Sequence, residues 1–206
     1  MADAQLLAGL LLVAGPVVGL IPVAHPALIP FWSATRERQL EIVGAHRRAW
    51  WALNAGFGVA TAATIAGLAV LPLLAATTEG AAALLPALAA YALGGVLWCA
   101  VLAIRGMVTP RLASLAGAGE ATEPGESLLG AAQEGLFDGF VVATGLALVA
   151  LGIGLAATGI VAPPIAVVQA LAGAGVLAWL LATGDVIPAV LYLPTMVLGV
   201  ALLAAG

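Results

Sequence analysis

Six long apolar runs constrain this chain more than any other feature of its sequence. A helix of about 20 apolar residues crosses a bilayer core of ~30 Å. Runs near or above that length lie at residues 5–29, 49–75, 82–104, 136–158, 163–183 and 186–205. Each run has to be helical, because backbone amides in hydrocarbon need partners within their own segment. The sequence therefore predicts an all-α, polytopic integral membrane protein with about six transmembrane helices in one compact bundle.

The composition excludes an ordinary soluble domain. Hydrophobic residues make up 64% of the 206 residues and charged residues only 8%, whereas about 25% of the residues of a typical soluble domain are charged. A net charge of −4 offers no extended basic surface, so we expect no nucleic-acid partner. The lone Cys99 excludes a disulfide within the chain. Arginine as the sole basic side chain besides histidine, with an excess of alanine, indicates a GC-rich prokaryotic genome.

Two polar stretches interrupt the apolar runs. Residues 33–48 hold four arginines and two glutamates beside Leu40, Ile42 and Val43. This pattern predicts an amphipathic helix on the cytoplasmic surface. Residues 112–128 are rich in Gly, Ala and Glu, which is typical of a flexible loop, and we expect that loop to be cytoplasmic as well.

The arginines predict the orientation. All six lie between the first and second runs or at the end of the third run, and the opposite end has only Asp3 and Glu79 as ionisable side chains. Loops that carry arginine stay on the cytoplasmic side of a membrane. We therefore expect a cell-membrane protein whose two termini face outward.

Glu134 and Asp138 are the most informative polar pair. They are four residues apart, so they lie on one helix face. A carboxylate near the membrane needs a partner, and Arg48 and Arg105 are the expected ones. Two interpretations stay open: an ion- or proton-binding pair, as in a small proton-coupled transporter, and a structural ion pair at the interface.

The two histidines offer another alternative. His25 and His46 lie on consecutive predicted helices at the same end of the bundle. Imidazoles from facing helices can hold a b-type haem. The other interpretation is structural, with His25 bonding a carbonyl left free by the surrounding prolines.

Glycine pairs predict close helix packing. Gly15 and Gly19 in the first run, and Gly135 and Gly139 in the fourth, have the spacing of small-xxx-small motifs. We expect another helix to approach each pair.

The sequence carries no GxSxG, HExxH or phosphate-binding loop. We therefore expect a non-enzymatic protein: a membrane subunit, a scaffold or a lipophile-binding bundle with a polar cytoplasmic rim. Its partners would be the lipid bilayer and other membrane subunits or further copies of itself. No cofactor is predicted outside the haem alternative.

Overall fold

The computed structural model describes residues 2–119 and 123–205, with side chains in the second stretch described from residue 127. These residues form helices, and no strand occurs among them. The α-helices are α1 (Ala2–Leu20), α2 (Arg36–Ala45), α3 (Arg47–Val70), α4 (Thr78–Gly117), α5 (Glu123–Thr158), α6 (Pro163–Thr183) and α7 (Leu193–Ala205). Four short 3-10 helices join them: η1 (Ile21–Ala24), η2 (Ile29–Ser33), η3 (Leu71–Leu74) and η4 (Pro188–Tyr192).

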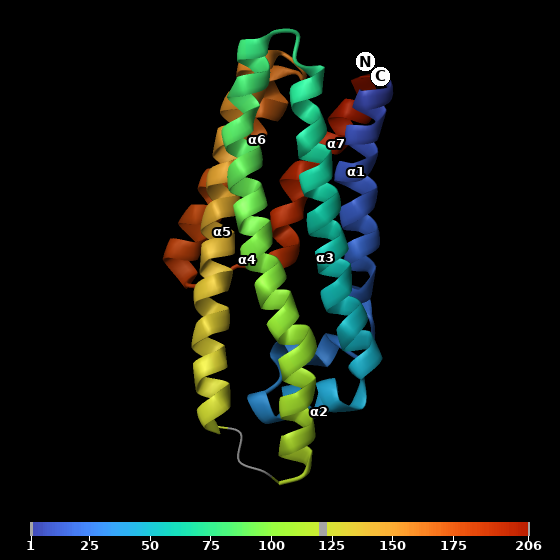
Figure 1. Cartoon of the computed structure of the whole chain (residues 1–206), viewed down its shortest axis with the longest axis vertical. Coiled ribbons are helices and arrows are strands. Elements are labelled where there is room, and N and C mark those ends of the chain that lie inside the picture. Colours follow the sequence, from blue (N-terminus) through green and yellow to red (C-terminus); the bar gives the residue numbers. More distant parts are fainter. Residues whose placement is uncertain (1, 120–122, 206) are drawn as a thin grey trace.

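Six helices in the described part of the chain are long and apolar enough to cross a membrane. This agrees with the six apolar runs. α1 packs along α3 and α7, and α5 packs between α4 and α6 (Figure 1). The two chain termini lie side by side at one end of the bundle, and α2 lies near the other end (Figure 1).

α4 and α5 are much longer than a bilayer requires. With 40 residues, α4 measures about 60 Å at 1.5 Å per residue, twice the thickness of a bilayer core. Both helices extend past the end of α6 on the side where α2 lies (Figure 1). The fold therefore has one end built from α2, the last turns of α4 and the first turns of α5.

Glycines bring two antiparallel helix pairs into backbone contact. A Cβ atom added to Gly19 of α1 would lie 2.3 Å from the carbonyl oxygen of Gly56 of α3, and the reverse distance is also 2.3 Å. A Cβ at Gly15 would lie 2.1 Å from that of Ala63. A Cβ at Gly173 of α6 would lie 2.4 Å from the carbonyl oxygen of Gly145 in α5, whose own Cβ would meet the side chain of a leucine in α6. These contacts are the close approach that small residues permit.

The prediction of close packing is wrong for Gly135, and Gly139 is approached only by a side chain of α4. A Cβ at Gly135 would meet no atom within 4 Å, and one at Gly139 would meet only the tip of Leu97. The spacing of the two glycines is correct for a packing motif, but within the described residues no backbone of another element lies within 4 Å of a Cβ at either position.

The first apolar run does not continue as one α-helix to residue 29. α1 ends at Leu20, because prolines at 22, 26 and 30 lack the amide that a helix needs. The chain instead makes successive three-residue turns, in which the amides of His25, Leu28 and Phe31 donate to carbonyl oxygens three residues earlier, at 2.9–3.2 Å. This segment folds back against the bundle and leads into α2.

Residues 112–128 form less of a loop than the sequence predicts. α4 continues to Gly117, where Gly119 with a φ of 76° ends the helical turn, and α5 begins at Glu123. Leu112 is buried, and alanine favours helix, so the segment stays helical despite its glycines. The rest of the predicted loop, residues 120–122, lies outside the described residues.

α2 has the amphipathic pattern predicted for residues 33–48. Leu40, Ile42 and Val43 are buried, whereas the arginines at 36 and 38 are exposed. Arg38 donates to Glu41 at 2.6 Å along the exposed face. α2 packs mainly against α4.

Candidate functional site

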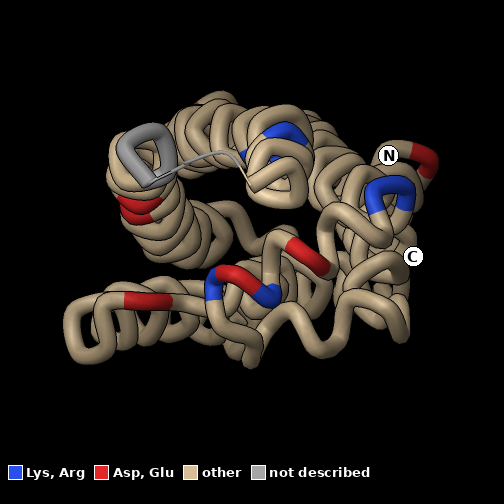
Figure 2. The backbone as a smooth tube through the Cα atoms, turned by 90° about the horizontal axis from the view of Figure 1, so that it is seen from below, with Lys and Arg blue, Asp and Glu red and all other residues tan. Residues whose placement is uncertain are grey.

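The end of the bundle that contains α2 carries most of the charge. Figure 2 looks onto this end and shows arginines and carboxylates on several of the elements that form it. We call it the arginine end, because all six arginines of the chain (Arg36, Arg38, Arg47, Arg48, Arg105, Arg111) lie in α2, the first turn of α3 and the later part of α4. The sequence predicts this gathering.

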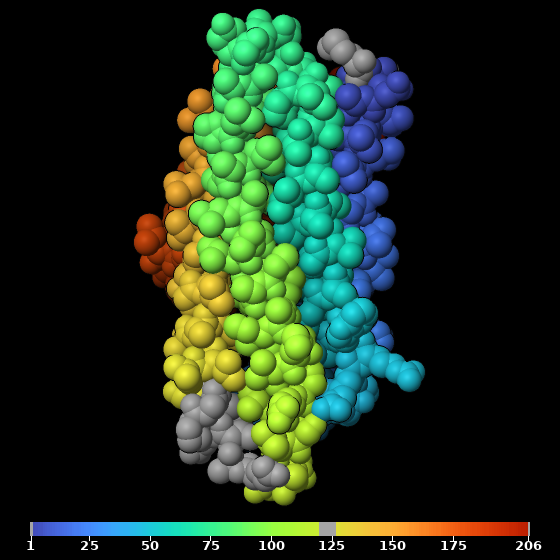
Figure 3. All heavy atoms as spheres, in the orientation of Figure 1, coloured from blue at the N-terminus to red at the C-terminus, as the bar shows by residue number. Residues whose placement is uncertain are grey.

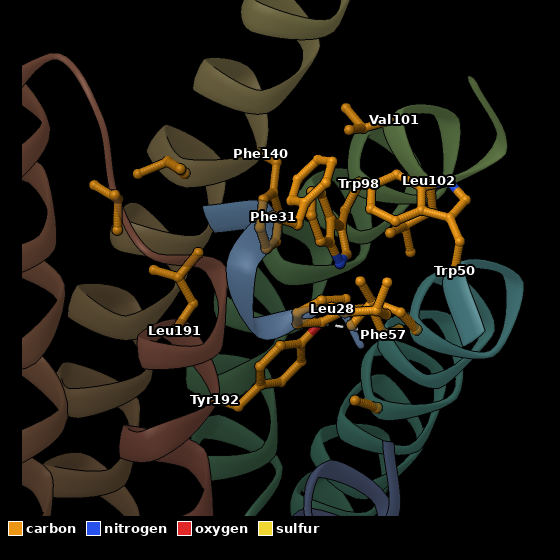
Figure 4. Close-up of a cluster of buried hydrophobic side chains, with 14 of the residues drawn as sticks. Leu28, Phe31, Trp50, Phe57, Trp98, Val101, Leu102, Phe140, Leu191 and Tyr192 are labelled. Carbon is orange, nitrogen blue, oxygen red and sulfur yellow. Dashed lines mark hydrogen bonds between the residues drawn. The ribbon is translucent and has the colours of Figure 1, made fainter. Parts of the chain in front are cut away.

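A cluster of aromatic side chains lies inside the arginine end. Trp98 of α4 is fully buried and stacks on Phe140 of α5, with ring centroids 4.9 Å apart. Phe57 of α3 meets the same indole edge-on at 5.5 Å. Leu28 and Phe31, from the segment that folds back, lie in the middle of this cluster (Figure 4). This segment therefore fills the space between α3, α4 and α5.

A cavity of about 570 Å³ lies beside this cluster, and we call it the arginine-end cavity. Its apolar wall is formed chiefly by Phe31, Trp32, Trp50, Val101, Phe137 and Ile187. Its polar lining consists of Arg36, Arg105, Thr109, Gln133, Glu134 and Asp185. A pocket of this size with apolar walls and a few convergent polar groups is typical of a small-molecule site.

Arg105 is held against the aromatic wall. Its guanidinium carbon lies 5.1 Å from the ring centroid of Trp50, which is cation–π geometry. The indole Nε1 of Trp50 donates to the carbonyl oxygen of Arg105 at 2.7 Å. α3 and α4 are thus joined at this point, and the half-buried guanidinium is positioned at the cavity.

The carboxylates of the cavity come from two separate segments. Glu134 projects from α5 and is exposed. Asp185 follows α6 and accepts a hydrogen bond on Oδ1 from the amide of Val186 at 2.7 Å. The lining therefore combines two guanidiniums with two carboxylates, and its net charge is close to zero.

The structure separates the residues of the predicted polar site. Arg105 and Glu134 line the same cavity, but Asp138 is exposed one turn farther along α5 and does not line it. Among the described residues, Asp138 forms no ion pair with Arg105 or Arg48. Arg48 lies on the outer side of α3, away from this cavity. Glu134 and Asp138 share one helix face, but this does not bring them together with both arginines in one site.

His25 and His46 line one shallow hollow of about 450 Å³ together with Arg47 and Arg48. Nδ1 of His25 accepts a hydrogen bond from the amide of Ala27 at 3.2 Å. The other described residues of the hollow are small, so they offer no large apolar side chain to a haem face. Haem ligation by these histidines stays a prediction.

A buried polar contact lies next to the aromatic cluster. The hydroxyls of Tyr192 and Thr61 are 2.7 Å apart, and both side chains are buried. Among the described side chains, Nε1 of Trp98 is buried without a hydrogen-bond partner. Sequence reasoning missed these residues, since nothing in the spacing of a lone Thr or Tyr distinguishes a core position from a lipid-facing one.

The sequence places Trp32 and Trp50 at this end of the bundle, but it does not predict that they line a cavity. Trp32 and Trp50 are the signal that was available, because tryptophans near a polar helix end suggest an interface. Their convergence depends on the turns at residues 22–34, which only the structure reveals.

Comparison with protein-family models, with curated proteins and with solved structures gives no match to this chain.

Proposed function

We propose that this chain is a multi-pass protein of a cell membrane that binds a small amphipathic molecule in the arginine-end cavity. Among the functions that the sequence suggests, this is the lipophile-binding bundle. The observation that carries the proposal is the cavity itself, in which an aromatic wall faces a ring of polar groups.

The surface of the bundle supports a lipid environment. Large apolar side chains are exposed along several helices, among them Leu73 at 72%, Leu171 at 66% and Leu181 at 88%. Such a surface in water would cause aggregation, whereas in hydrocarbon it needs no further cover. α6, with 21 residues, matches a bilayer core of ~30 Å.

The lining of the cavity indicates the class of ligand. Trp32, Trp50 and Phe137 suit a flat or chain-like apolar body. Arg105 and Glu134 can each bind a hydrogen-bonding head, the first as a donor and the second as an acceptor. Because the lining carries both signs of charge, a neutral or zwitterionic head fits better than a multiply charged one.

The test of binding is mass spectrometry of small molecules that co-purify with the protein in a mild detergent. We expect a lipophile in stoichiometric amount with the wild-type protein. Arg105→Gln should lower its occupancy, because the cavity loses its half-buried cation and the contact with Trp50. The matched control is Arg38→Gln, which removes the same charge from an exposed side chain outside the cavity. An equal occupancy in both variants, or a wild-type protein without any lipophile, would refute the proposal.

The orientation can be tested with cysteines. In a Cys99→Ala background, Glu37→Cys should be protected from a membrane-impermeant maleimide in intact cells, and Glu79→Cys should react. The reverse pattern would place the arginine end outside. Recovery of the protein in the aqueous fraction without detergent would refute membrane insertion altogether.

The remaining hypotheses stay predictions. A small transporter would lose flux into liposomes in Asp138→Asn, and a haem protein would show a Soret band that is lost in His25→Ala and His46→Ala. A subunit or homo-oligomer would retain a partner during purification.

A further inference from the structure

Three arginines converge on the outer face of the bundle, away from the arginine-end cavity. Arg47 and Arg48 come from the first turn of α3, and Arg111 comes from the later part of α4. Together with Trp51, Met107 and Ser114 they line a cleft of about 610 Å³, which we call the α3–α4 cleft. α3 and α4 lie side by side on the face shown in Figure 3.

The cleft carries a concentrated positive charge. No carboxylate is among the described residues that line it. Arg48 and Arg111 are exposed, and the first turn of α3 adds the positive end of a helix dipole. Guanidiniums bind phosphate oxygens in pairs of parallel hydrogen bonds, so a cleft lined by several arginines suits a phosphate group.

Arg47 fixes the base of the cleft. Its Nη2 donates to the carbonyl oxygen of Pro110 at 2.7 Å and also contacts the hydroxyl of Ser114. These bonds tie the start of α3 to the last turns of α4. The helix segments that carry Arg48 and Arg111 are therefore held together.

An apolar groove continues from the cleft along the same two helices. It measures about 290 Å³ and shares Trp51, Gly106 and Met107 with the cleft. Trp51 is 67% exposed and Met107 is 77% exposed, so both offer apolar surface to the outside. The groove runs from the charged end of the bundle toward its middle, past Gly58 and Cys99.

Two glycines keep the groove open. A Cβ at Gly58 would meet no atom within 4 Å, and one at Gly106 would meet only Cβ of Asn54, at 3.9 Å. Gly56 of the same helix differs, because a Cβ there would collide with the backbone of Gly19 in α1. No described helix occupies the space in front of Gly58, so it is available to a ligand.

A buried acceptor also lines the groove. Asn54 is 5% exposed, its Nδ2 donates to the carbonyl oxygen of Trp50 at 2.8 Å, and its Oδ1 has no partner among the described residues. A buried carbonyl oxygen without a donor is costly, so a donor brought to this side chain would stabilise it.

We propose that the α3–α4 cleft and its groove bind one anionic phospholipid, with the phosphate on Arg47, Arg48 and Arg111 and an acyl chain along Gly58 and Gly106. Basic pockets between transmembrane helices bind anionic headgroups in this manner. The apolar groove is what distinguishes a phospholipid from a free phosphate ion. The proposal rests on membrane insertion but not on the ligand of the arginine-end cavity.

The experiment is native mass spectrometry of the detergent-solubilised full chain titrated with dioleoyl phosphatidylglycerol or dioleoyl phosphatidylcholine. We expect one phosphatidylglycerol to bind in preference to phosphatidylcholine. The double variant Arg48→Gln/Arg111→Gln should weaken phosphatidylglycerol binding about tenfold or more, the effect of losing one or two charge-assisted hydrogen bonds. Arg38→Gln, which lies outside the cleft, should bind like the wild type.

The groove is tested by a second pair of variants. Gly58→Leu fills the groove and should weaken binding of phosphatidylglycerol, whereas Gly175→Leu places the same side chain at an open position of α6 and should not. Gel filtration and thermal unfolding of each variant establish that it is folded.

Two outcomes would overturn the proposal. One is an undiminished preference for phosphatidylglycerol in Arg48→Gln/Arg111→Gln. The other is displacement of phosphatidylglycerol by excess inorganic phosphate together with wild-type binding in Gly58→Leu, which would show a site for a free anion. A failure of ligand binding in Arg105→Gln leaves this site unaffected, so the two proposals can fail separately.

Discussion

The contact between α1 and α3 gives the sharpest test of the bundle. In Gly56→Ala, the new Cβ would lie 2.3 Å from the carbonyl oxygen of Gly19 and 3.2 Å from the ring of Pro22. Restoring an ordinary van der Waals distance requires the two helices to move apart by about 1 Å. Overpacking of this kind costs about 1–3 kcal/mol. The first of these clashes is with backbone, which cannot rotate away as a flexible side chain can.

The matched control is Gly58→Ala, two residues farther along the same helix. Its Cβ would meet no atom within 4 Å. Both variants gain the helix propensity of alanine over glycine, about 1 kcal/mol in water, so this gain cancels in the comparison. We therefore expect Gly56→Ala to be less stable than Gly58→Ala by about 1–3 kcal/mol, the cost of overpacking alone.

The assay is unfolding in mixed detergent micelles, followed by circular dichroism and tryptophan fluorescence. Gly19→Ala should behave like Gly56→Ala, because its Cβ would also lie 2.3 Å from a carbonyl oxygen of the facing helix. The double variant should cost less than the sum of the two, since the helices are already separated in either single variant. Equal stability of Gly56→Ala and Gly58→Ala would refute the close approach of α1 and α3.

Three further predictions concern the polar contacts. Tyr192→Phe removes the hydroxyl that lies 2.7 Å from Oγ1 of Thr61 and should lower the free energy of unfolding by about 1 kcal/mol; unchanged stability would show that this bond contributes nothing. Hydrogen bonds from its own backbone amide and from the Thr35 hydroxyl lower the pKa of Glu37. The charged carboxylate therefore stabilises the start of α2 fully above its ordinary pKa, and this stabilisation is lost as the pH falls through the lowered value. The protection factors of the α2 amides should thus fall in acid, and Glu37→Gln should make that fall smaller; an equal fall in Glu37→Gln would contradict this reasoning. Arg47→Ala breaks the hydrogen bond to the carbonyl oxygen of Pro110, so it should speed hydrogen exchange in the last turns of α4 but not in its first half. An equal increase in exchange along the whole of α4 would contradict this.

The helices could be predicted from the sequence because the length of each apolar run is enough to identify them. An apolar run of about 20 residues has to satisfy its amides internally, whatever surrounds it. The ends of the helices were less predictable. Residues 112–128 have the glycines of a loop, but burial of Leu112 keeps α4 helical to Gly117. Tertiary packing decides such boundaries, and composition does not record it.

The sequence also predicts which end of the bundle carries the site, but it does not predict which side chains line that site. Connectivity alone places Arg105 and Glu134 at the same end. Which groups meet depends on the rotation of each helix about its axis, and a spacing of four residues leaves that rotation open. The structure turns Arg105 toward Trp50 instead of Asp138. The same limit explains the glycines: Gly19 and Gly135 belong to motifs of identical spacing, but only Gly19 faces another backbone.

The arginine-end cavity follows from a conflict within the first apolar run. Residues 21–31 are too apolar to lie in water and, with three prolines, cannot extend the α-helix. The segment resolves the conflict by turning every three residues, which pairs its free amides locally and lets Leu28 and Phe31 enter the core. Phe31 then lies 4.7 Å from Trp50 by ring centroids, and the space left between these rings and the polar groups of α4 and α5 is the cavity. Regularly spaced prolines in an apolar run at the end of a span therefore predict a segment that turns back and packs between helices. The residues beside such a segment are candidates for a ligand site.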